Sequence, residues 1–404
     1  MNLSTRISDA SMAFLQGNLQ KADLLCRREL QDVADSLPAL LLLARIAEHL
    51  GLHDHAQDYL TQAKASDPTV EIQSIPASYG SLPALDTRRY LLIKAWGYGF
   101  CSDIDHVYGA LLLAEITGRV PVVKWGTNSL FRSPDVENAF ESFFEPVSFL
   151  TWDDLQAPDL SYFPAKWNST NITLPELKRW SREGSRQSGI YLLNRPENVV
   201  VSDYYIKVND LMPWIPAGHP FRQMSRNEIY RKLNEKYFKL RPHLANRIER
   251  IWQEKMAHTN WLAVHVRGTD KVFEVSNLNE VNKAYLDHID RILNVNPEVS
   301  IFLMTDSKQI EQEFKAKFSD RLLTMDFYRG GGTTGIHLEG NPRTELGEQV
   351  IIDTYLASRC DLFLGNGGSN VSTSVRHLRH WVHGTYFLIG HDFLGTIDTS
   401  LHDW

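Results

Sequence analysis

The chain has 404 residues, of which 43% are hydrophobic and 23% charged, a composition that supports two or three globular domains without stabilising disulfides or metal ions. Lys and Arg number 42 against 49 Asp and Glu, giving a formal net charge of −7, which argues against a protein that binds nucleic acid backbone. The three cysteines are far apart in sequence and no apolar run is long enough to span a membrane, so we expect a cytoplasmic protein.

The first seventy residues have helical periodicity and contain a repeat of 34 residues. Gly17 and Gly51 are one period apart, and so are Ala13 and Ala47. This spacing resembles the tetratricopeptide family, with about two copies where an independent array needs at least three. We therefore predict helical repeats over residues 1–68. They serve either as a docking surface for a protein partner, or as a cap on the rest of the chain or a dimer contact.

The segment 69–86 is rich in Ser and Pro and lacks helical periodicity, so we interpret it as a linker. After it, an apolar strand at 90–95 is followed by a glycine turn at 97–99, a helix that ends at Gly118, and a second strand in RVPVVKW. This order of strand, turn, helix and strand is the βαβ unit of a parallel sheet.

The middle of the chain, residues 125–242, is less regular, with one strand predicted in ENVVVSDYY and one helix over 226–239. Regular alternation then returns. Strands are predicted at 261–267, 301–305, LLTMDF and 361–365, and helices at 282–293, 307–318, 344–359 and from 371 onward.

Two βα-rich halves around an irregular middle predict an α/β fold with two facing Rossmann-like lobes, which bind ligands at the carboxyl ends of their strands. We place the boundaries at 1–68 for the helical repeats, 69–86 for the linker, 87–245 for the first lobe with the irregular segment, and 246–404 for the second lobe.

Polar residues follow the predicted strand at 261–267. Arg267 carries a planar fork of donors that suits two oxygens of a phosphate, and each such charge-assisted hydrogen bond is worth about 1.5–3 kcal/mol. Lys271 adds a second cation, and Asp270 is placed to orient either one. A surface cluster of salt bridges accounts equally well for these residues alone.

The segment AVHVRGTDK at 263–271 resembles the HxRxxDK motif of the α-1,6-fucosyltransferases, a family shared with the nodulation-factor fucosyltransferases and related to the protein O-fucosyltransferases. Four other segments resemble the family in the same order: GYGFCSDIDHVYGALLLAEITGRVPVV, FKLRPHLANRIERI, IFLMTDS and RTELGEQVIIDTYLASRCDLFLGNGGSNVSTSV. The resemblance covers about residues 90–130 and 235–380. It implies a GT-B fold and inverting transfer of fucose from GDP-fucose to a glycan hydroxyl, with no cofactor and no metal.

The resemblance also implies roles for individual residues. Arg267 would neutralise the diphosphate as its bond to the sugar breaks, within a catalytic set of Arg267, Asp270, Lys271 and Glu274. The residues expected to bind the nucleotide sugar are Gly97, Tyr98, Gly99, Phe100, His265, Arg267, Asp306, Asp353, Ser369 and Asn370. Where the family usually has a second arginine, this chain has Gly268.

The general base stays open, because the family's downstream acidic position falls on Val275 and Glu274 lies one residue earlier. Glu274, Asp306 or no base at all are the three alternatives. A positioned base normally contributes about 10²–10⁴-fold to the rate.

Asp353 lies on a helix whose apolar residues cover most of its circumference, so the carboxylate should be buried and should have a hydrogen-bond donor. The resemblance implies that this donor is the N1–H and N2–H₂ edge of guanine. The alternative is a structural ion pair with Arg376 or Arg379.

The pair Asp103 and Asp105 forms a weak DxD metal motif, but acidic residues are also favoured at the start of a helix.

Two further alternatives concern the function as a whole. The same fold could use GDP-mannose or another nucleotide sugar, or a protein hydroxyl as acceptor. A non-catalytic scaffold that binds nucleotide and recruits partners through the repeats is the third possibility. The glycines at 330–332 begin a loop that either closes over the donor or simply connects two elements.

Overall fold

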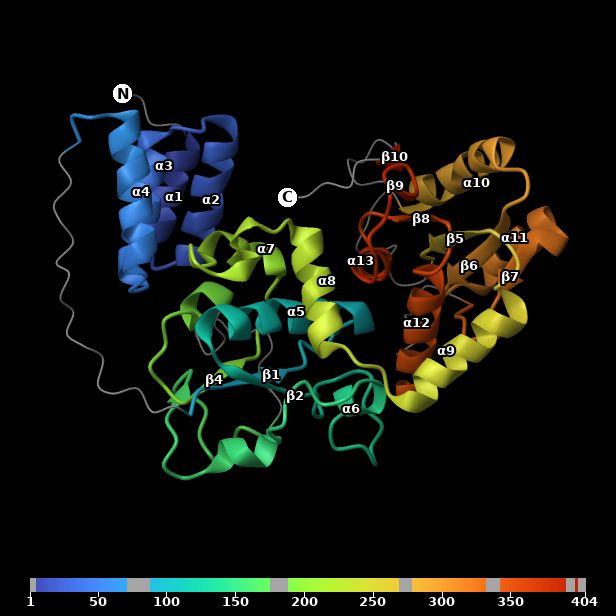
Figure 1. Ribbon diagram of the computed structural model, residues 1–404, viewed down its shortest axis with the longest axis horizontal. Helices are drawn as coiled ribbons and strands as arrows, with labels where there is room; N and C mark the ends of the chain where they lie inside the picture. The colour runs from blue at the N-terminus through green and yellow to red at the C-terminus, as the bar shows by residue number, and fades with distance from the viewer. Residues whose placement is uncertain are drawn as a thin grey trace.

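The computed structural model describes residues 5–70, 88–174, 188–268, 278–331, 342–389 and 397–398. A helical bundle, a lobe built on a parallel sheet and a second lobe built on a larger sheet follow one another along the chain (Figure 1). This arrangement confirms the predicted α/β fold with two Rossmann-like lobes and an N-terminal helical extension. In the described part of the chain, no helix combines the length and the apolar character needed to cross a bilayer.

The bundle consists of two helical hairpins. Its helices are α1 (Thr5–Leu15), α2 (Leu19–Asp32), α3 (Leu37–His49) and α4 (His53–Ser66). Gly17 and Gly51 occupy the two hairpin turns and have positive φ angles of 75° and 69°. The 34-residue spacing therefore corresponds to a repeated helix–turn–helix, whereas membership of the tetratricopeptide family stays a prediction.

The turns of the two hairpins contact the first lobe. The Tyr191 hydroxyl accepts a hydrogen bond from the Leu19 amide at 2.9 Å and donates one to the Gly17 carbonyl at 2.8 Å. The Asn194 amide group donates to the Gly51 carbonyl at 3.1 Å. A Cβ atom at Gly51 would lie 2.5 Å from Asn194 Nδ2, so this turn requires glycine both for its φ and for the contact.

Trp214 provides a third contact between bundle and lobe. Its ring centroid lies 5.6 Å from that of His55, and the Arg27 guanidinium lies 5.1 Å from the Trp214 ring. The bundle is thus a cap packed on the first lobe, as one of the two predicted roles requires.

The first lobe contains a parallel sheet with the strand order β2-β1-β4-β3 among the described residues. Its strands are β1 (Tyr90–Lys94), β2 (Val120–Lys124), β3 (Tyr162–Phe163) and β4 (Val199–Ser202). Its helices are α5 (Phe100–Thr117), α6 (Phe140–Phe143), α7 (Val208–Leu211) and α8 (Arg226–Tyr237), with short 3₁₀ turns η1 (Trp152–Gln156), η2 (Gly189–Leu192), η3 (Met212–Trp214) and η4 (Pro220–Gln223). Strand β2 therefore lies at one edge of this sheet.

The second lobe contains a sheet with the order β10-β9-β8-β5-β6-β7, parallel except for β10. Its strands are β5 (Trp261–Val266), β6 (Ser300–Thr305), β7 (Leu322–Thr324), β8 (Leu362–Asn366), β9 (Tyr386–Ile389) and β10 (Ile397–Asp398). Its helices are α9 (Pro242–Lys255), α10 (Leu278–Val295), α11 (Lys308–Phe318), α12 (Arg343–Ala357) and α13 (Asn370–His377), with the 3₁₀ turn η6 (Ser319–Arg321). Every residue of β5 is buried between β8 and β6, so the carboxyl ends of these three strands meet at one edge.

The predicted strands and helices of both lobes are present within a few residues of their expected bounds. The strands β3, β9 and β10 and the helices α6, α7 and α9 were not predicted. Strands β3 and β10 have two residues each, too few to produce a period. Most of the predicted linker, residues 71–86, lies outside the described residues.

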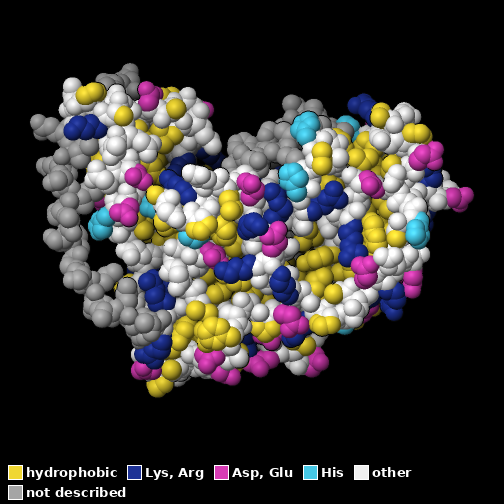
Figure 2. Space-filling view, viewed as in Figure 1, with side chains coloured by type: hydrophobic (Ala, Val, Ile, Leu, Met, Phe, Trp, Pro, Cys, Tyr) yellow, Lys and Arg dark blue, Asp and Glu magenta, His cyan; other side chains and the backbone are white. Residues whose placement is uncertain are grey.

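The face shown in Figure 2 carries intermixed charges where the two lobes meet, around α8. Two ion pairs lie there, Lys232 with Glu235 at 2.8 Å and Lys236 with Glu115 at 2.5 Å. These paired charges of both signs make a solvated surface on this face.

Candidate functional site

The strand ends of the second lobe bring Arg267 and Asp306 together. Val266 and Thr305 are register partners on β5 and β6, so the next residue of each strand emerges beside the other. The Arg267 guanidinium donates to one carboxylate oxygen of Asp306, and the Gly268 amide donates to the other at 2.9 Å. Asp306 thereby fixes the direction of the Arg267 fork.

His265, two residues earlier on β5, is buried and lies in a network of hydrogen bonds. Its Nδ1 is 2.8 Å from the Ser372 hydroxyl, which accepts a hydrogen bond from the Asn366 amide at 3.0 Å. Burial, and then the Arg267 charge, lower the pKa of His265 to about 3, so the ring is neutral at physiological pH. We assign the Ser372 proton to the bond with Nδ1, which leaves the ring proton on Nε2.

A cavity of about 70 Å³ unites these residues with others that are distant in sequence. Its lining comes from β5, β6, the segment after β7, and the helices α12 and α13, and includes His265, Arg267, Thr305, Asp306, Phe327, Tyr328, Gln349, Asp353 and Val371. Sequence reasoning had singled out four of them: His265, Arg267, Asp306 and Asp353. They converge at the carboxyl edge of the sheet, where a ligand of this fold class is expected.

Asp353 enters this cavity from α12. Its Oδ1 is buried and has no hydrogen-bond partner among the residues that the structure describes. Burial raises the pKa of Asp353 to about 8, against the opposing effect of the Arg329 charge. The two arginines proposed as ion-pair partners are engaged elsewhere: Arg379 donates to backbone carbonyls and Arg376 lies over the Tyr386 ring. The carboxyl is therefore placed to accept hydrogen bonds from a ligand.

The glycine turn between β1 and α5 is held by Asp103. The Asp103 carboxylate accepts hydrogen bonds from the amides of Gly97 at 2.7 Å and Tyr98 at 3.3 Å. Phe100 follows Gly99, and its side chain is buried in the core against Phe143. The Phe100 side chain is therefore closed to a ligand, and the Gly97 and Tyr98 amides serve the turn itself.

The DxD pair is part of the structural framework. Asp105 accepts hydrogen bonds from the hydroxyls of Tyr205 and Tyr230, both at 2.5 Å, and burial raises the pKa of its carboxyl. Across the described ranges, no group of three or more His, Cys, Asp or Glu residues is close enough to hold a metal ion.

The start of α13 faces the start of α5 across the junction of the lobes. The Asn370 amide group donates to the Ser102 hydroxyl at 2.6 Å. Ser369 is the N-cap residue of α13, is buried, and makes no side-chain hydrogen bond to the helix. Both helix N-termini carry the partial positive charge that favours an anion.

Three predicted catalytic residues, Asp270, Lys271 and Glu274, lie outside the described residues, as does most of the glycine-rich loop that begins at Gly330. Conversely, sequence reasoning missed Ser372 and the cavity residues Phe327, Tyr328 and Gln349. The hydrogen bond between Ser372 and His265 depends on β5 and β8 being neighbours in the sheet, so no local sequence pattern predicts it.

No protein-family model matches the sequence, and no curated protein matches it. Solved structures do match. The chain resembles NodZ alpha-1,6-fucosyltransferase soaked with GDP-fucose at 20% identity and a TM-score of 0.53, over 77% of this chain and 98% of that one. Fucosyltransferase NodZ from Bradyrhizobium matches at 20% identity and a TM-score of 0.51, with the same coverage. The NodZ enzyme co-crystallized with GDP matches at 19% identity and a TM-score of 0.50, over 77% and 97% of the two chains. The resemblance is thus confirmed as a shared fold.

Proposed function

We propose that this chain, which has the fold of the NodZ fucosyltransferases, binds a GDP-sugar and transfers fucose from it to a hydroxyl of a glycan. The observation that carries the proposal is the cavity in which Arg267, held by Asp306, faces the same space as the buried and unpartnered Asp353 oxygen. One end of this space suits a diphosphate and the other a hydrogen-bond donor such as guanine.

Arg267 stabilises the leaving group. In the transfer, the acceptor oxygen attacks C1 of the sugar from the face opposite the diphosphate, the bond from C1 to the β-phosphate oxygen breaks, and GDP departs. Arg267 neutralises the charge that develops on that oxygen, and it needs no reorganisation because Asp306 already directs it. His265, neutral with its proton on Nε2, adds an uncharged donor on the same side.

The nucleotide is bound by both helix starts and by Asp353. The Asn370 amide and the Ser369 hydroxyl, with the amides of Gly99 and Phe100 at the start of α5, supply donors to the phosphates. Asp353 accepts from the N1–H and N2–H₂ groups of guanine, which favours its ionised form. No metal is assigned to this reaction, in which Arg267 supplies the positive charge.

The acceptor proton passes to a base or to solvent. Asp306 is a poor candidate for this base, because its two oxygens already accept from Arg267 and Gly268. Glu274 stays the proposed base, with unassisted transfer as the alternative.

The test is GDP or UDP release from GDP-fucose, GDP-mannose and UDP-GlcNAc, with and without EDTA, beside calorimetric titration with GDP. We expect release from GDP-fucose alone, unaffected by EDTA, and binding of GDP. Turnover of another donor would refute the assignment of fucose as the transferred sugar. Inhibition by EDTA would refute the metal-free mechanism. Binding of GDP without turnover of any donor in the presence of glycan acceptors would favour the scaffold. Absence of both would refute the proposal.

A further inference from the structure

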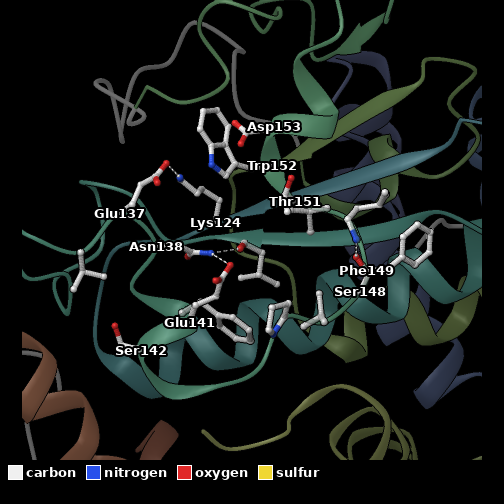
Figure 3. A pocket seen from close by; sticks show the side chains of 17 residues that line it. Lys124, Glu137, Asn138, Glu141, Ser142, Ser148, Phe149, Thr151, Trp152 and Asp153 are labelled. Atoms are coloured by element: carbon white, nitrogen blue, oxygen red, sulfur yellow. Dashed lines mark hydrogen bonds and ion pairs between the residues drawn. The ribbon is translucent and has the colours of Figure 1, made fainter.

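A cavity larger than the donor cavity lies outside the site described above. It is a groove of about 480 Å³ along the outer side of the edge strand β2, between α6 and the segment 146–153. Figure 3 shows Trp152 and Asp153 at one wall, Glu141 and Ser142 at the opposite wall, and Lys124 and Asn138 between them. None of these residues takes part in the proposed transfer.

Three aromatic residues line the groove, and two of them, Phe149 and Trp152, have side chains that are at least partly exposed, whereas Phe140 is buried. Phe149 is 87% exposed, and Trp152 is partly exposed, with the Lys124 ammonium 4.2 Å from its ring. In Figure 3 the two rings lie apart, with Trp152 at the top and Phe149 at the right of the view. An aromatic surface left open to water suits a ligand with an apolar face, and the C–H face of a pyranose ring is such a face.

The polar groups of the groove are mostly acceptors held in fixed positions. Glu137 pairs with Lys124 at 2.5 Å, and this hydrogen bond lowers the pKa of Glu137. Glu141 accepts from Asn138 at 2.7 Å, and Asp153 accepts from Gln156 at 3.1 Å. Fixed carboxylates and amides pair with hydroxyl groups at little cost in side-chain entropy.

The charge of the lining excludes anions. Among the lining residues, Glu137, Glu141 and Asp153 carry negative charge, and Lys124 is the one cation. A phosphate, sulfate or sialic acid would meet a net negative surface, whereas a neutral sugar would not.

The edge strand is closed to a peptide. Pro121 has no N–H group, and its carbonyl already accepts from the Ser148 hydroxyl at 2.7 Å. The Asn138 side chain accepts from the Trp125 amide and donates to the Val123 carbonyl, both at 2.8 Å. A peptide strand could not displace these bonds without loss, so β-strand addition is disfavoured.

We propose that this groove binds a neutral oligosaccharide, as the part of the glycan acceptor that does not react; this inference rests on the proposed function. Lys124 is the last residue of β2, so the groove opens at the carboxyl end of its sheet. The wall formed by α6 also touches the donor lobe, because Phe143 packs against Gly347 of α12, the helix that carries Asp353.

The test is binding to an array of neutral, sulfated and sialylated glycans, followed by titration of the best neutral glycan. Trp152→Ala, Phe149→Ala and Glu141→Gln should each weaken that binding about ten-fold or more, the effect of losing one good contact. Trp152→Phe keeps a ring and should lose less than Trp152→Ala. Leu15→Ala, which removes an exposed apolar side chain on the bundle, is the matched control and should change nothing.

Titration with GDP separates the two proposals. All groove variants should bind GDP as the wild type does, because none of the substituted residues lines the donor cavity. If the wild-type protein does not bind GDP, the proposed function is refuted. With GDP bound normally, the groove proposal is overturned if neutral glycans fail to bind at millimolar concentration, if the groove variants bind them as wild type does, or if anionic glycans bind better.

Discussion

Arg267 is directed into its cavity by a neighbouring carboxylate before any ligand is present. A guanidinium that is already oriented contributes its full electrostatic effect when charge develops on a leaving group. A lysine at this position would carry the same charge as Arg267 but would lack the planar fork of donors.

Arg267→Ala should lower kcat by about 10²–10⁴-fold, since one or two charge-assisted hydrogen bonds are lost in the transition state. Arg267→Lys should recover only part of that loss. The melting temperature should fall by a few degrees at most, because Asp306 keeps the Gly268 hydrogen bond. Arg359→Ala, which removes a surface ion pair with Glu249, is the control for rate and stability. An alanine variant with more than a tenth of wild-type turnover would contradict the assignment.

Asp353 links nucleotide binding to pH. Its pKa is raised to about 8, so between about pH 4 and pH 8 the folded protein holds a proton that the unfolded chain has released. The contribution of this carboxyl to the free energy of unfolding therefore falls as pH rises through that window. Asp353→Asn cannot ionise, so it should raise the melting temperature at pH 9 more than at pH 5. It should also weaken GDP binding about 10–100-fold, because one acceptor is replaced by a donor. Thermal melts at both pH values and calorimetry with GDP measure these effects. An asparagine variant that binds GDP like the wild type would exclude Asp353 from guanine recognition.

At the scale of whole elements, the site depends on strand order. The order β8-β5-β6 places the ends of three strands side by side although β5 and β8 are separated by nearly a hundred residues. The alternation of apolar strands and helices was enough to predict the lobes and the polar residues His265 and Arg267 at the end of one strand, whereas Asp306 was expected from the family resemblance. It could not predict that Asp306 pairs with Arg267 or Ser372 with His265, because adjacency in a sheet has no local pattern. The groove beside β2 was not predicted because its walls come from an irregular segment without a period.

The contact between α6 and α12 gives a prediction at this scale. A Cβ atom at Gly347 would lie 2.5 Å from Phe143 Cζ and 3.0 Å from Phe100 Cε2. Gly347→Ala should therefore lower the free energy of unfolding by about 1–3 kcal/mol through overpacking, although alanine is the better helix former. Gly331→Ala, with nothing within 4 Å of its Cβ position, is the matched control in urea denaturation. A Gly347→Ala variant more stable than wild type would contradict this prediction, because it would show that the Phe143 and Phe100 rings can move aside at little energetic cost.

For the molecule as a whole, buried apolar residues of the bundle and of both lobes form one continuous hydrophobic core, and specific polar and ring contacts are added to it. Tyr191, Asn194 and Trp214 join the bundle to the first lobe. The bond from Asn370 to Ser102 joins the two lobes between the starts of their helices. The groove is lined by α6 and the donor cavity by α12, and these two helices pack against each other.

Tyr191→Phe removes both hydroxyl hydrogen bonds to the first hairpin turn and should speed hydrogen exchange at the Leu19 amide about five- to ten-fold. Mass spectrometry of peptides that span this turn measures the change, and donor turnover should stay as in the wild type. Tyr162→Phe, whose hydroxyl bonds lie within the lobe, should leave exchange in the bundle unaltered. Equal protection in the Tyr191→Phe variant would mean that other contacts hold the bundle in place.

The protected edge of β2 has a consequence for the behaviour of the protein in concentrated solution. One border of the first sheet carries Pro121 and is covered by the Ser148 and Asn138 side chains, and the other border, β3, has two residues. Short or covered borders offer no template for the strands of another molecule. Aggregation on heating should then begin with unfolded chains, and the native protein should resist growth into fibrils from this sheet.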